Sequence, residues 1–132
     1  MEQACRFPFF TLRLRGGPSL LHALEEPLAQ LCCRRGEVEK GGTFDFELRL
    51  TAAAPPPAGE EGSWHPLLPE EPRRLMVDRE RALFLAAAGA SRALVHPGRG
   101  EATLHLDPAG FAALPHWQRR SLLVDILLAL LS

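Results

Sequence analysis

The amino-acid sequence has no tyrosine, one lysine and three cysteines, and its formal net charge is -1. A charge this close to zero creates no field that would attract nucleic acid or an acidic membrane, so we expect neither as a partner. An odd number of cysteines, two of them adjacent, is not the pattern of a disulfide framework. We therefore interpret Cys32 and Cys33 as small buried apolar residues of a protein in a reducing compartment, and Cys5 has no evident base that would make it a nucleophile.

The sequence also lacks the motifs that mark most catalytic and cofactor sites. It has no glycine-rich phosphate-binding motif, and its only lysine, Lys40, lies in an E-K-G-G turn. No serine stands in a nucleophile elbow of the G-x-S-x-G type. The histidines have no carboxylate or cysteine at metal-binding spacing, although His96 and His105 flank a predicted hairpin and are expected near each other. We predict no catalytic residue, no cofactor, no metal ligand and, on balance, no enzymatic activity.

The most informative segment is the end of the chain, H-W-Q-R-R-S-L-L-V-D-I-L-L-A-L-L-S over residues 116–132. Its apolar run, from Ser121 to Leu131, is much shorter than the roughly 20 residues that a membrane-spanning helix needs, and Asp125 interrupts it. The N-terminal sequence M-E-Q-A-C-R-F-P-F-F has neither the apolar core nor the cleavage site of a signal peptide. We therefore expect a cytoplasmic protein without a membrane partner.

The C-terminal run predicts a helix that is apolar on every side, and such a helix must be buried all round. The domain wraps around it, a partner covers it, or the chain once continued. We predict self-association through residues 117–131, and the partner is a second copy or another polypeptide. The candidate interaction residues are Trp64, Trp117, Leu123, Leu127, Leu128 and Leu131. Trp64 follows a flexible segment and either clamps it to the sheet or contacts the partner.

Alternating apolar residues predict strands over 7–15 and 43–51, which share the pattern L-R-L and are expected to pair antiparallel. Between them, leucines at three- and four-residue spacing predict a helix over 19–33, which Pro27 should kink or divide. Short strands are expected near 74–78, 82–87, 92–96 and 101–106, and Asp107-Pro108 and Pro115 should begin two helices. The predicted fold is α+β, with an antiparallel sheet of about five to six strands and the helices on one face.

Residues 52–63 read A-A-A-P-P-P-A-G-E-E-G-S, a composition typical of a flexible surface loop. The 51 residues before this segment are too few for a comfortable core of their own. We therefore interpret residues 1–132 as one domain that carries a loop, rather than as two domains.

The opening F-P-F-F-T-L-R-L-R, the β-rich middle and the helix W-Q-R-R-S-L-L-V-D-I-L-L-A-L-L together resemble the N-terminal portion of HPr-kinase-like proteins from bacterial gene clusters. In that family the equivalent helix leads into a P-loop kinase core, which this chain does not contain. The resemblance therefore implies a detached or truncated non-catalytic portion, with no kinase residue carried over. It also implies that the last helix continues into further structure.

Three functional hypotheses follow. The first is a non-catalytic protein-interaction or regulatory domain related to the HPr-kinase-like N-terminal portion. The second is a dimeric polypeptide binder similar to the small α+β secretion chaperones of bacteria. The third is an enzyme or small-ligand binder whose site the sequence does not reveal, for which a pocket with a strongly perturbed titratable group would be the sign.

Overall fold

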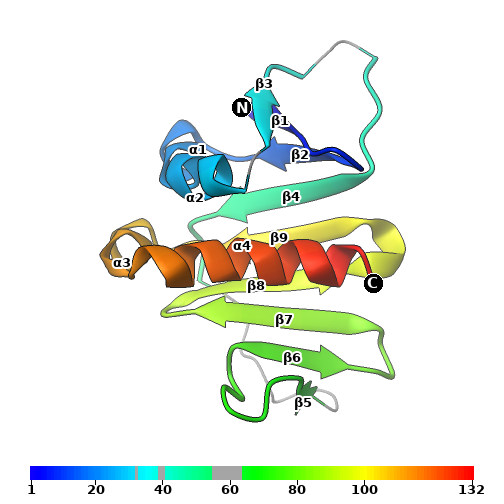
Figure 1. Cartoon of the computed structure of the whole chain (residues 1–132), viewed down its shortest axis with the longest axis vertical. Coiled ribbons are helices and arrows are strands. Elements are labelled where there is room, and N and C mark those ends of the chain that lie inside the picture. The colour runs from blue at the N-terminus through cyan, green and yellow to red at the C-terminus, as the bar shows by residue number, and fades with distance from the viewer. Residues whose placement is uncertain (32, 39–40, 55–63) are drawn as a thin grey trace.

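The computed structural model describes residues 1–31, 33–38, 41–54 and 64–132. In this part of the chain nine strands form one sheet in the order β3-β1-β2-β4-β9-β8-β7-β6-β5 (Figure 1). The predicted α+β class is confirmed, but the predicted antiparallel sheet of five to six strands is wrong because the sheet is larger and mixed. The strands are β1 (Glu2–Arg6), β2 (Thr11–Arg15), β3 (Arg34–Gly36), β4 (Phe46–Thr51), β5 (Trp64–Pro66), β6 (Leu75–Asp78), β7 (Leu83–Ala88), β8 (Ser91–His96) and β9 (Glu101–His105).

Strands β2 and β4 are neighbours, as predicted, but they run parallel rather than antiparallel. Strand β4 is also parallel to β9, whereas the other neighbouring pairs are antiparallel. A parallel pair needs a crossover of a dozen or more residues, and the chain between Arg15 and Phe46 supplies one that contains two helices and β3. The alternation of the two strands is the same for either direction, so it could not reveal which one the chain adopts.

The four helices of the described part are α1 (Pro18–Ala23), α2 (Glu25–Gln30), α3 (Pro108–Ala113) and α4 (His116–Leu130). The single helix predicted over 19–33 is divided at Leu24, which ends α1 and precedes α2. Pro27 is the third residue of α2, where its missing N–H costs no intrahelical hydrogen bond. Asp107-Pro108 and Pro115 stand at the starts of α3 and α4, as predicted.

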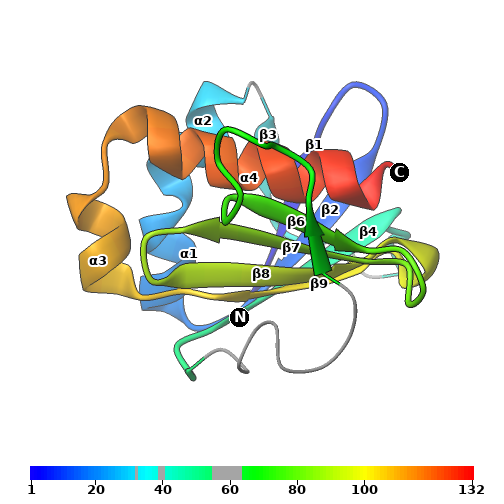
Figure 2. The same cartoon turned by 90° about the horizontal axis from the view of Figure 1, so that it is seen from below.

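Figure 2 shows the sheet nearly edge-on, with α2 and α4 above one face and α1 and α3 at one end of the strands. Helix α4 packs against β7, β8 and β9 and also contacts α2. The core lies between this layer and the covered face of the sheet. Its largest buried side chains are Leu12, Leu14, Leu21, Leu24, Leu28, Leu48, Leu104, Leu106, Phe111, Leu122, Leu123 and Ile126.

The opposite face of the sheet carries charged side chains on β2 and β4. Glu47 lies between Arg15 and Arg49, with oxygen–nitrogen distances of 3.2 Å and 3.0 Å. Partial burial raises the pKa of Glu47, but hydrogen bonds from Arg49 and Arg15 outweigh it and hold this pKa below its usual value. Glu47 is therefore an ion-pair partner of one arginine on the neighbouring strand and one on its own strand, rather than a reactive carboxyl group.

The two cysteines that the structure describes differ in burial. Cys33, predicted to be buried, is only half-buried, and its thiol donates a hydrogen bond to the carbonyl oxygen of Leu28 at 3.3 Å. Cys5 is fully buried, and burial, together with the neighbouring Cys33 thiol, raises its pKa to about 12, so the Cys5 thiol stays protonated and unreactive. Cys32 and most of the predicted flexible loop, residues 55–63, lie outside the described residues. Residues 52–54 are described and belong to neither a helix nor a strand.

Candidate functional site

Helix α4 presents apolar side chains away from the core, and these are the main candidate for a functional surface. Trp117 is 51% exposed, Leu128 is 58% exposed and Leu131, directly after the helix, is 53% exposed. Ser121 and Val124 are half-buried between them. The five residues Trp117, Ser121, Val124, Leu128 and Leu131, which we call the outer stripe, recur at alternating spacings of four and three residues. This spacing places them on one side of the helix.

The other side of α4 is buried and fixes how the helix is rotated. Leu122, Leu123 and Ile126 are 0–2% exposed and belong to the hydrophobic core. Because the core already holds these residues, the outer stripe cannot turn inward without exposing them. The stripe is therefore a constant feature of the folded chain.

A partly buried ion pair adds to this anchoring. Asp125 is 4% exposed, and its carboxylate accepts hydrogen bonds from Arg74 at 3.0 Å to Nε and 3.4 Å to a terminal nitrogen. Arg74, just before β6, also donates to Glu71 at 2.7 Å. The hydrogen bonds to Asp125 and Glu71 raise the pKa of Arg74, so its guanidinium stays charged. The pair links α4 to the segment that leads into β6.

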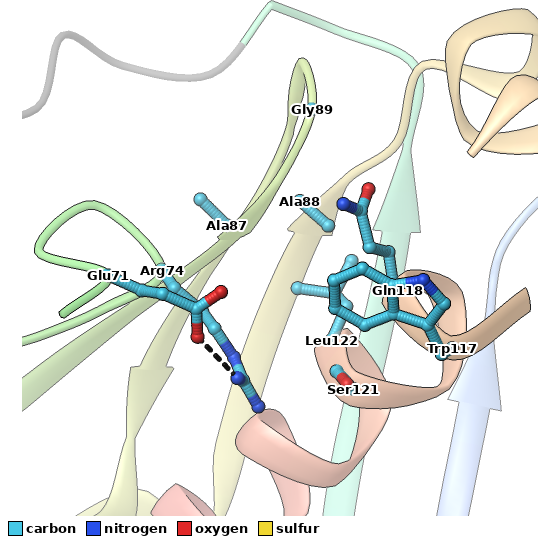
Figure 3. Close-up of a pocket in the computed structure, with 9 residues that line it drawn as sticks. All are labelled: Glu71, Arg74, Ala87, Ala88, Gly89, Trp117, Gln118, Ser121 and Leu122. Carbon is cyan, nitrogen blue, oxygen red and sulfur yellow. Dashed lines mark hydrogen bonds and ion pairs between the residues drawn. The ribbon is translucent and has the colours of Figure 1, made fainter. Parts of the chain in front are cut away.

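A groove of about 160 Å³ opens beside the outer stripe, between α4 and the turn that joins β7 to β8 (Figure 3). Trp117 and Gln118 stand on its helix side, and the Glu71–Arg74 pair stands across from them. Its other lining residues are Ala87, Ala88, Gly89, Ser121 and Leu122. Gly89 has a φ of +58°, and a Cβ atom there would lie 3.3 Å from the side chain of Leu114, so the turn requires this glycine.

The chemistry of this groove suits a side chain better than a substrate. Its volume is below the roughly 300–1,000 Å³ of typical small-molecule sites. Its charged groups, Glu71 and Arg74, already pair with each other, and Arg74 also pairs with Asp125. The groove therefore offers room for one apolar side chain beside the Trp117 ring, with no free acid or base at its centre.

The structure brings only part of the predicted interaction residues together. Trp117, Leu128 and Leu131 share the outer stripe, and Leu127 is half-buried against the core beside it. Leu123 is a core residue, 2% exposed, so we leave it out of the candidate surface.

Trp64 lies elsewhere, in the edge strand β5, where it pairs with Asp78. The guanidinium of Arg81 lies 5.5 Å from its ring centre, and Arg81 also binds the buried Asp78 carboxylate at 2.5 Å. These contacts tie β5 to the turn between β6 and β7. Trp64 is therefore not part of the outer stripe.

The histidines do not gather into a site. His96 pairs with Glu101 and His105 pairs with Arg92, so His96 and His105 lie at opposite ends of the β8–β9 pair rather than near each other. Over residues 1–31, 33–38, 41–54 and 64–132, no group of three or more metal-binding side chains is found.

Sequence reasoning missed Arg74, Glu71, Ser121 and Val124. The one signal that pointed to the ion pair was Asp125 itself, an acidic residue within an apolar helix. Such a residue must find a cation or hydrogen-bond donors when it is buried. The partner could not be chosen from the sequence because Arg74 is 51 residues away and several arginines were available.

No family model, curated protein or solved structure matches the chain. In the described part of the chain, none of the helices has the length and apolar character needed to cross a membrane.

Proposed function

We propose that this chain is a non-catalytic protein-interaction domain that binds another polypeptide through the outer stripe of α4. The observation that carries the proposal is the alignment of Trp117, Leu128 and Leu131, each more than half exposed, on one side of a single helix. Single exposed apolar residues are common, but an aligned set on a rigid element is typical of a binding surface.

The groove beside Trp117 supports the same function. Interfaces draw much of their affinity from a few aromatic residues packed in small pockets, and Trp117 stands at such a pocket. The core residues of α4 and the Arg74–Asp125 pair hold this surface in place before a partner arrives. A preformed surface binds at a lower entropic cost than one that must be ordered.

The resemblance to the N-terminal portion of HPr-kinase-like proteins and the alternative of a secretion-chaperone-like binder both stay predictions. The outer stripe is compatible with each, since both hypotheses require an apolar surface that another polypeptide covers. The third hypothesis, an enzyme or small-ligand binder, gains no support from the groove because of its small size and paired charges.

The proposal can be tested by site-specific photocrosslinking in cells that produce the whole chain. A benzophenone amino acid replaces Leu128 in one variant and Ala113, an exposed residue of α3, in a matched control. We expect a covalent product with a polypeptide from position 128 and none from position 113. Equal products from both positions, or no product from position 128, would overturn the proposed surface.

A further inference from the structure

We infer that the occupant of the outer stripe is the α4 helix of a second copy of this chain, lying antiparallel about a two-fold axis near Val124. The inference rests on the proposed function, because it names the partner of that same surface. It is carried by the spacing of the stripe, by the charges along the helix and by the position of the groove.

The spacing of the stripe is nearly symmetric about Val124. Trp117 precedes Val124 by seven residues and Leu131 follows it by seven; Ser121 precedes it by three and Leu128 follows it by four. An antiparallel copy therefore places Leu131 opposite Trp117 and Leu128 opposite Ser121. The four-and-three spacing is also that of the apolar seam where two helices pack side by side.

The charges along α4 favour the antiparallel direction. Its basic side chains, His116, Arg119 and Arg120, all lie in the first five residues, and no charged side chain follows Asp125. Arg119 and His116 contact Glu26 of α2, whereas Arg120 is exposed. A parallel pair would place the two Arg120 side chains together. An antiparallel pair places each Arg120 beside the last turn of the other helix, where the helix dipole is negative.

The groove gives the second copy a specific contact. In the antiparallel arrangement Leu131 of one copy reaches the Trp117 end of the other, where the groove of about 160 Å³ opens. Leu128 meets Ser121, so a large side chain faces a small one. A parallel arrangement would instead bring the two bulky Trp117 rings together at the groove and would place Leu131 far from it.

The small area of the helix–helix interface limits the expected affinity of the dimer. The stripe is only about 21 Å long, given a rise of 1.5 Å per residue. A single pair of such helices buries less than the roughly 1,600 Å² of a standard interface. We therefore expect a concentration-dependent dimer that dissociates in the micromolar range or above.

Disulfide trapping of the whole chain tests both the partner and its direction. The variants are Trp117→Cys, Leu131→Cys and Val124→Cys, oxidised with copper-phenanthroline, with the parent chain treated alongside to account for its own cysteines. In the antiparallel pair the two copies of residue 117 are about 21 Å apart along the helix, far beyond the 7 Å that a disulfide tolerates between Cα atoms. Mass spectrometry of the cross-linked peptides identifies which residues are joined.

We expect Val124→Cys to link to itself, and a mixture of Trp117→Cys and Leu131→Cys to give a product joining residues 117 and 131. Each of these last two variants alone should show no more dimer than the parent. Self-linking at 117 and at 131 would overturn the antiparallel direction. The absence of a disulfide in every combination would overturn the second copy as the partner. If the photocrosslinker at position 128 then joined the chain to a different polypeptide, the proposed function would still hold.

Discussion

The two sides of helix α4 both carry leucines but have different surroundings. Leu122, Leu123 and Leu130 are at most 2% exposed, whereas Leu128 and Leu131 are more than half exposed. The inner side is enclosed by the sheet and by α2, whereas the described part of the chain covers the outer side only partly. The comparison shows that the leucines of this helix lie in two different environments, whose contributions to stability a substitution series can separate.

Substitutions on the inner side of α4 should cause the largest loss in the free energy of unfolding. Leu123→Ala removes a fully enclosed side chain and leaves a cavity, so the free energy of unfolding should fall by about 2–5 kcal/mol. Urea denaturation of the variant and the parent at the same low protein concentration measures this loss. A change below about 0.5 kcal/mol would contradict the placement of Leu123 in the core.

Breaking the Arg74–Asp125 ion pair should cause the next largest loss in the free energy of unfolding. Arg74→Met leaves the buried Asp125 carboxylate without its cation, which should cost about 1–3 kcal/mol, towards the lower value because Arg74 itself is partly exposed. The control is Arg73→Met, since Arg73 is exposed. Equal stability of the two variants in thermal unfolding would show that the pair does not hold α4 in place.

The charged face of the sheet, opposite α2 and α4, should give a smaller, pH-dependent effect on stability. Glu47 has a folded pKa below its ordinary value, so it stabilises the fold above that value and loses this contribution as the pH falls. Glu47→Gln should therefore flatten the dependence of stability on pH between about 5 and 3, with a loss at neutral pH below about 1 kcal/mol. Glu70→Gln, at an exposed position, is the control, and an identical pH profile for both variants would contradict the role of the arginine contacts.

The smallest effect on stability is expected on the outer side of α4. Leu128→Ala removes the same atoms as Leu123→Ala, but from a side chain that is already 58% exposed. At a concentration where the chain is monomeric, its free energy of unfolding should change by less than about 0.5 kcal/mol. A loss as large as that of Leu123→Ala would mean that the two sides of α4 are not different, and the outer stripe would be part of the core.

Much of this fold could be predicted from local patterns. Alternation located β2 and β4, and turns at glycine and proline set off most of the later strands. Asp107-Pro108 located the start of α3, and Pro115 located the start of α4. Strand β1 was missed because E-Q-A-C-R shows no alternation, although Ala4 and Cys5 are both buried. The direction of β4 was missed because the crossover that decides it is a long-range feature.

The candidate site was predicted only in part, for a similar reason. The apolar C-terminal run indicated an interaction helix, but its composition could not show which leucines would face the sheet. That choice depends on the rotation of α4, which the core contacts and the Arg74–Asp125 pair determine together. Leu123 and Leu128 therefore looked equivalent in the sequence and differ in the structure.

The mass of the folded chain in solution, measured as a function of its concentration, decides whether the outer stripe joins two copies. Sedimentation equilibrium should show the parent approaching twice its 14.5 kDa as the concentration rises. The double variant Leu128→Glu/Leu131→Glu should stay at the mass of one chain with an unchanged unfolding temperature at low concentration. A parent that remains at 14.5 kDa at the highest concentration, together with no photocrosslink from position 128, would contradict the account that the outer stripe of α4 is a binding surface.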